Sequence, residues 1–124
     1  MENKILADTS VLIDLQRAKK ETVKKFKYNK DSICISRITA CEFIYGSRNK
    51  KEKKLNKEFI EFLLILEITA EVSELAYILL DKYSLKFNLG IADSLIASTA
   101  LYNGLKLWTL NKKHFERIKE LDLF

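Results

Sequence analysis

The chain has 124 residues, of which 48% are hydrophobic and 31% are charged, and its formal net charge is +5 at pH 7. A chain of this length buries one ordinary hydrophobic core, so we expect a single domain over residues 1–124 and exclude a second one. The positive charge favours an acidic partner such as nucleic acid, although a well-solvated surface would carry the same charge.

The apolar segments of the sequence are too short for a membrane protein. The longest cluster, residues 62–66, ends at Glu67 and is much shorter than a bilayer is thick. The first residues lack the basic region and long apolar core of a signal peptide. We therefore expect a soluble, cytoplasmic protein that makes no contact with a membrane. Cys34 and Cys41 lack metal-motif spacing and lie in apolar segments, which predicts that both are reduced core residues.

Strand and helix patterns alternate along the chain. The first half predicts a strand over residues 5–7, a helix over 10–17, a lysine-rich helical segment over 19–28, a strand over 32–36, and a helix over 38–47 that Gly46 stops. The second half predicts helices over 50–66, 73–83 and 91–102, strands over 67–69 and 106–110, and a tail with a short helix and an edge strand at 121–123. This alternation predicts an α/β three-layer sandwich, in which helices flank a mainly parallel sheet.

Asp8 follows the first predicted strand directly and precedes Thr9 and Ser10. Ligands of open α/β sheets bind at the carboxyl ends of the strands, so Asp8 is a candidate site residue. An acid at this position also commonly caps the next helix through its backbone N–H groups. The sequence leaves both roles open.

Glu42 lies in an apolar part of the helix predicted over residues 38–47. Ile38, Cys41 and Tyr45 define an apolar face on this helix, and Glu42 lies at its border. An unpaired carboxylate is costly to bury there, which a metal ion or a basic partner would explain. A side chain that turns toward solvent would explain it equally well.

Asp93 lies near the start of the helix predicted over residues 91–102. It shares one stripe of that helix with Ala97 and Ala100, at spacings of four and three residues. Because small residues let this stripe pack closely, the Asp93 carboxylate would point into the crevice above the sheet. Capping of its own helix is the alternative role for Asp93.

We expect the carboxylates of Asp8, Glu42 and Asp93 to meet at one metal site. Neighbouring carboxylates raise one another's pKa unless a cation lies between them. Oxygen ligands favour Mg²⁺ or Mn²⁺, and Zn²⁺ is not expected because the sequence has one histidine and no cysteine pair. Such an ion activates water and stabilises charge on a phosphate. The basic segments 17–30 and 48–57 would then hold a phosphate backbone, unless they are only solvated surfaces.

Four segments together resemble the PIN-domain ribonucleases, most closely the small VapC-type toxins of toxin–antitoxin pairs. They occur in the order and spacing of that family and read ADTSVLID at 7–14, ITACEFIYG at 38–46, IADSLIASTA at 91–100 and LWTLNKKHF at 107–115. The resemblance implies a five-stranded parallel sheet and a Mg²⁺- or Mn²⁺-dependent endoribonuclease with Asp8, Glu42 and Asp93 as its acidic site. It further implies a homodimer and a cognate antitoxin whose tail enters the site. Hydrogen bonds to the ligands or to metal-bound water would come from Thr9 or Ser10, Thr109 and Asn111.

The chain departs from this family at a fourth acid that many relatives carry after the last core strand, where it has Asn111 and His114. We hypothesise one tightly held ion, or a second ion that is recruited only with RNA. We interpret His114 as a surface or packing residue.

Two other functions are weighed against the metal-dependent nuclease. A metal-free ribonuclease with Glu42 as base and His114 as acid would leave a 2′,3′-cyclic phosphate, whereas metal-activated water leaves a 5′-phosphate. A non-catalytic RNA- or protein-binding module on the same fold is the alternative from another class. A phosphoryl-receiver domain needs an acid pair after the first strand and an acceptor Asp after the third, and residues 8–10 and 68–69 supply neither. A phosphatase of the Asp-x-Asp type fails because Ser10 stands in place of its second acid.

Overall fold

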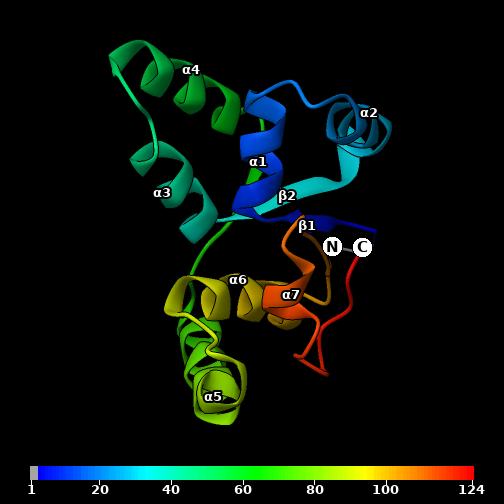
Figure 1. Cartoon of the computed structure of the whole chain (residues 1–124), viewed down its shortest axis with the longest axis vertical. Coiled ribbons are helices and arrows are strands. Elements are labelled where there is room, and N and C mark those ends of the chain that lie inside the picture. The colour runs from blue at the N-terminus through cyan, green and yellow to red at the C-terminus, as the bar shows by residue number, and fades with distance from the viewer. Residues whose placement is uncertain (1–2) are drawn as a thin grey trace.

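The computed structural model describes residues 3–124 and contains a parallel sheet between two layers of helices (Figure 1). The strands pair in the order β3-β2-β1-β4, and they are β1 (Ile5–Ala7), β2 (Ile33–Ser36), β3 (Leu64–Leu66) and β4 (Lys106–Trp108). Leu6 of β1 pairs with Cys34 on one side and with Leu107 on the other. Because all the strands are parallel and β1 and β2 are central, Asp8 and Ser36 lie at the same edge of the sheet.

Helices cover both faces of the sheet (Figure 1). One layer contains α1 (Thr9–Gln16), α2 (Lys20–Asn29), α3 (Arg37–Tyr45) and α4 (Lys50–Glu61), with a 3₁₀ turn, η1 (Lys30–Ser32), before β2. The other layer contains α5 (Ala70–Phe87), α6 (Ile91–Tyr102) and α7 (Lys112–Phe115). The predicted three-layer α/β sandwich is confirmed. Within residues 3–124, no helix is long and apolar enough to cross a membrane.

Each face of the sheet has its own hydrophobic core. Ile5 and Ala7 contribute to the core under α1 to α4, whereas Leu6 contributes to the core under α5 and α6. This division follows from the alternation of side chains along a strand. Both helical layers therefore pack against β1, and Asp8 follows directly after this strand.

The expected fifth strand is reduced to a single bridge. Leu107 of β4 pairs with Leu123 alone, between backbone hydrogen bonds from Leu107 N–H to the Asp122 carbonyl (2.9 Å) and from Phe124 N–H to the Leu107 carbonyl (2.7 Å). The sheet among the described residues therefore has four strands, and the prediction of five was wrong.

The prediction was also wrong between residues 62 and 69. It extended the fourth helix to residue 66 and placed a strand at 67–69, whereas α4 ends at Glu61 and β3 spans Leu64–Leu66. The apolar run continues the helical pattern locally, but pairing with the buried strand β2 decides its conformation. Thr69 instead caps α5, and its hydroxyl accepts a hydrogen bond from Val72 N–H at 3.2 Å.

Of the two cysteines, Cys34 is buried as predicted, but Cys41 is exposed. The apolar face assigned to the helix at 38–47 was misplaced, because Tyr45 on that face is 92% exposed. Side chains one or two positions away form the buried face of α3: Thr39, Ala40 and Phe43.

Candidate active site

Asp8 lies where β1 passes into α1. Its backbone N–H donates to the Trp108 carbonyl at 3.0 Å, which continues the pairing with β4 by one step. Its Oδ1 atom accepts a hydrogen bond from Val11 N–H at 3.4 Å and so caps α1. The residue is buried, with only 3% of its surface exposed. Asp8 therefore caps α1 and also lies at the carboxyl edge of the sheet.

Two hydroxyl groups orient the Asp8 carboxylate. Ser10 Oγ donates to Oδ1 and Thr109 Oγ1 donates to Oδ2, each at 2.5 Å. The hydroxyl oxygens in turn accept backbone N–H groups, from Leu110 to Ser10 at 3.0 Å and from Asn111 to Thr109 at 2.9 Å. The loop after β4 thus directs both hydroxyl protons toward Asp8.

Glu42 is joined to the start of α1. Ser36 caps α3 by accepting a hydrogen bond from Thr39 N–H at 3.1 Å, so this helix begins where β2 ends. Glu42 lies in α3 and is half-buried. Thr9 Oγ1 donates to its Oε1 atom at 2.6 Å, and Thr9 is the neighbour of Asp8 in sequence.

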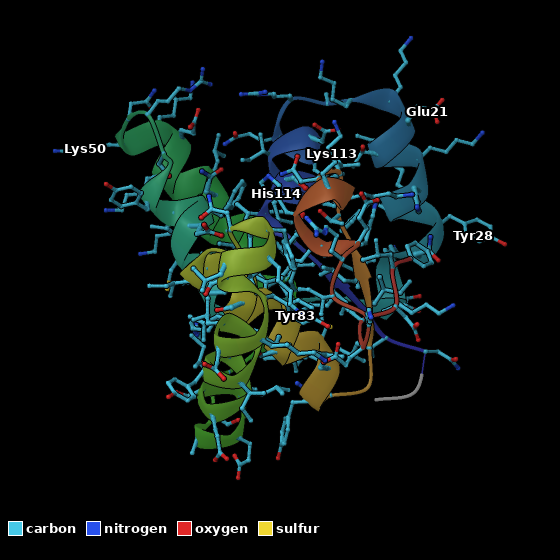
Figure 2. All side chains as sticks on the ribbon, turned by 60° about the horizontal axis from the view of Figure 1, so that its bottom comes forward. Glu21, Tyr28, Lys50, Tyr83, Lys113 and His114 are labelled. Atoms are coloured by element: carbon cyan, nitrogen blue, oxygen red, sulfur yellow. The ribbon has the colours of Figure 1, made fainter. Side chains whose placement is uncertain are left out.

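Asp93 approaches the site from the opposite helical layer. It lies in the first turn of α6, and its side chain is 29% exposed. Ala97 and Ala100 of the predicted stripe are fully buried beneath it. His114 of α7 places Nδ1 at 3.2 Å from Asp93 Oδ2, and Figure 2 shows His114 on α7.

The contact with Asp93 was missed by the sequence analysis, which treated His114 as a surface or packing residue. His114 is exposed, as that interpretation expected, but its ring touches a candidate metal ligand. The position of His114 in the sequence could have predicted this contact. His114 follows closely after Thr109, in the short helix α7, and the chain leaves β4 at the same edge of the sheet as Asp8.

The charges of the three carboxylates influence one another. Burial raises the pKa of Asp8, although hydrogen bonds from Ser10 and Thr109 oppose this effect. Burial also raises the pKa of Asp93, the charge of His114 lowers it, and the negative charges of Asp8 and Glu42 raise it again. The structure therefore brings all three acids close enough for repulsion, which a cation relieves.

Within residues 3–124, no three His, Cys, Asp or Glu side chains form a preformed metal-binding cluster. The chemistry of the three carboxylates nevertheless fits a hard divalent ion. They present only oxygen, and the hydroxyl groups of Thr9, Ser10 and Thr109 donate to Asp8 and Glu42 without using all of their lone pairs. Such oxygen ligands are the ones that Mg²⁺ and Mn²⁺ prefer.

Asn111 contributes to this site through its backbone. Its N–H group orients Thr109, whereas its side chain makes no hydrogen bond with any residue of the described chain. It lies at the N-terminal end of α7 and is exposed. The predicted contact of its side chain with a ligand or with metal-bound water stays a prediction.

Basic side chains flank the carboxylates on two sides. Arg17 and Arg48 line a groove next to Glu42, and Lys112 and Lys113 line a depression with His114. Arg48 forms an ion pair with Glu52, which lines the same groove, so Arg17 on one side and the two lysines on the other supply the positive charge. This arrangement suits an extended polyanion better than a small acidic molecule.

The chain matches the family model of the PIN domain over residues 5–121. It is 43% identical over 125 residues to Ribonuclease VapC1 of Methanocaldococcus jannaschii, a match that covers 98% of this chain and 86% of that relative. It is 35% identical over 129 residues to Ribonuclease VapC1 of Rickettsia felis, with coverage of 96% and 93%. The fold is similar to the crystal structure of DNA-bound VapBC from Salmonella typhimurium, with a TM-score of 0.84, 26% identity and coverage of 98% of this chain and 96% of that chain.

Proposed function

The chain belongs to the PIN domain family, and we propose that it is a metal-dependent endoribonuclease, the VapC-type toxin of a bacterial or archaeal type II toxin–antitoxin system. The proposal is supported by the hydrogen bond from Thr9, the neighbour of Asp8, to Glu42, and by the raised pKa of Asp93, which reflects burial and the charges of Asp8 and Glu42. The names of two similar relatives, both ribonucleases, support the same reaction.

Asp8, Glu42 and Asp93 would hold Mg²⁺ or Mn²⁺, which when bound supplies a water of lowered pKa and a positive charge at the scissile phosphate. The side chains around them prepare the carboxylates for this role. Ser10 and Thr109 hold both oxygens of Asp8 in one orientation, and burial keeps bulk water away from it. Preorganised ligands of this kind lower the cost of assembling the site.

His114 would position Asp93, and the flanking cations would bind the RNA backbone. His114 restrains Asp93 through the contact of Nδ1 with Oδ2. Arg17, Lys112 and Lys113 would contact phosphates on either side of the cut, with an affinity that falls as salt is added.

A cognate antitoxin is the second proposed partner. The Salmonella structure named above is a VapBC complex, which supports a protein partner for this chain as well. The homodimer stays a prediction from the resemblance, and the cytoplasmic location stays a prediction from the short apolar segments and the first residues.

Cleavage of a pool of cellular RNA that includes the tRNA fraction tests this function. We expect the wild-type protein to cut with Mn²⁺ or Mg²⁺, to leave 5′-phosphate ends, and to stop in EDTA. Asp93→Asn should cut at least about 100-fold more slowly, because one charged ligand is lost. The matched control is Asp81→Asn, which removes an exposed acid of α5 outside the site.

Three outcomes would contradict the proposal. Equal cutting by the wild type and Asp93→Asn would exclude the three-carboxylate mechanism. Cyclic phosphate ends that persist in EDTA and depend on His114 would favour the metal-free reaction. RNA binding without any cutting would favour the non-catalytic module.

A further inference from the structure

A groove outside the carboxylate site lies between α2 and the segment that leaves β4. Lys24, Lys25 and Tyr28 of α2 form one wall, and Trp108 and Leu110 form the other. None of these residues takes part in the carboxylate network through its side chain. Glu21 also lines the groove, which therefore combines aromatic rings and two lysines with one carboxylate, so its chemistry differs from that of the acidic site.

Leu110 connects this groove to the carboxylate site. Its N–H group donates to Ser10 Oγ, and Ser10 donates to Asp8. Its side chain is 45% exposed and also lines the depression beside His114. The groove and the depression beside His114 therefore share Leu110, so a polymer that crosses Leu110 would contact both.

Tyr28 presents an aromatic ring to this path. It lies near the end of α2 and is 90% exposed, and Figure 2 shows it at the outer side of that helix. Base rings stack on such aromatic side chains with little dependence on sequence. A single exposed tyrosine is ordinary on a protein surface, but this one shares a groove with two lysines beside a phosphodiesterase site.

Lys25 supplies a cation whose position is restrained. Its Nζ atom lies 4.4 Å from the centre of the Phe124 ring and 5.2 Å from that of Trp108. The two rings contact each other edge to face, with centroids 6.1 Å apart. Across residues 3–124, no carboxylate forms an ion pair with Lys25. Its charge is therefore held by rings and remains available to an anion.

We propose that this groove binds a nucleotide of single-stranded RNA next to the scissile bond, with the base stacked on Tyr28 and a phosphate at Lys25. The proposal rests on the function proposed for the adjoining site and names a substrate-binding surface for it. The partner is RNA because one groove pairs a stacking ring with lysines that form no ion pair among residues 3–124, and because it shares Leu110 with the depression that holds His114.

The test is the affinity for a short, labelled, mixed-sequence single-stranded RNA in EDTA, measured by fluorescence anisotropy. We expect Tyr28→Ala to weaken binding about five- to tenfold and Tyr28→Trp to retain it, because only the second keeps an aromatic face. The matched control is Tyr77→Ala, an exposed tyrosine on α5, which lies across the molecule from α2 in Figure 1. In the metal-dependent cleavage assay, Tyr28→Ala should raise KM and leave kcat near the wild-type value.

Lys25→Gln provides the second variant. It should weaken binding and reduce the dependence of affinity on salt by about one phosphate contact. Because Lys25 lies on two rings, thermal unfolding of this variant serves as a check that the fold is retained.

The outcomes separate this proposal from the proposed function. Wild-type RNA affinity in both Tyr28→Ala and Lys25→Gln would overturn the groove as an RNA subsite, even if cleavage still depends on Asp93; this is also the result if a protein occupies the groove. No binding of the wild type in EDTA would overturn it too. Binding that depends on Tyr28 in a protein that does not cut RNA would support the groove and overturn the nuclease.

Discussion

At the residue scale, the charge of Asp93 suits its proposed function but lowers the stability of the fold. Its side chain is only 29% exposed, and the negative charges of Asp8 and Glu42 raise its pKa further. The folded state therefore holds a proton on Asp93 more readily than the unfolded state does. Stability should fall as pH rises from the ordinary pKa of 3.8 through the raised pKa of the folded state.

This reasoning gives a prediction for Asp93→Asn at pH 7. The substitution removes the charge, so we expect the melting temperature to rise by roughly 2–5 °C while activity is lost. We also expect Mn²⁺ to stabilise the wild type and to have little effect on the variant. Circular dichroism melting curves with and without Mn²⁺ measure both effects. A lower melting temperature in Asp93→Asn, with Asp81→Asn unchanged, would contradict this account.

Single residues also show how far the sequence predicts the site. Asp8, Glu42 and Asp93 were identified because each acid interrupts an apolar pattern, and such interruptions are visible in a sequence. The contact of His114 with Asp93 and the rings around Lys25 depend on the path of the chain after β4. No local pattern records that path, so these contacts required the structure.

At the scale of elements, α3 shows how a helix can be predicted correctly while its orientation is wrong. Its limits were nearly correct, but Cys41 and Tyr45 face outward. The buried face is set by packing against α1 and α4, which the residues of α3 alone do not specify. The segment at β3 was also mispredicted, because the pairing with β2 determines the conformation of a strand of only three residues.

The orientation of α3 predicts different reactivities for the two cysteines. Burial raises the pKa of the Cys34 thiol to about 11, whereas Cys41 is exposed. We expect a thiol-reactive dye such as DTNB to label one cysteine in the native protein and two in denaturant. Cys41→Ser should abolish native labelling, and Cys34→Ser should not. Rapid native labelling of Cys41→Ser would show that the core under α5 and α6 does not protect Cys34.

At the scale of the whole molecule, the C-terminal tail is tied to α5 by polar contacts. Tyr83 Oη donates to Glu120 Oε1 at 2.6 Å, and Lys82 Nζ lies 3.2 Å from Oε2 of the same residue. The hydrogen bond from Tyr83 lowers the pKa of Glu120 below its ordinary value of 4.5. This contact therefore stabilises the fold above pH 4.5, and the contribution is lost as pH falls through the lowered pKa.

Tyr83→Phe tests this link between the tail and α5. We expect it to reduce the free energy of unfolding by about 0.5–1 kcal/mol at pH 7, a modest value because Glu120 is partly exposed. The difference from the wild type should shrink well below pH 4.5. Urea denaturation at the two pH values measures it. A difference that does not change with pH would assign the effect to packing of the ring instead.

The order in which the site residues occur along the chain also has a consequence during synthesis. Thr109 donates to Asp8 across 101 positions of sequence, and β4 pairs with β1 although it is the last strand made. During synthesis, the segments with Asp8 and Glu42 leave the ribosome before α6 and β4, which hold or position the other residues of the site. A nascent chain therefore lacks the proposed carboxylate site until α6 and β4 have also been made.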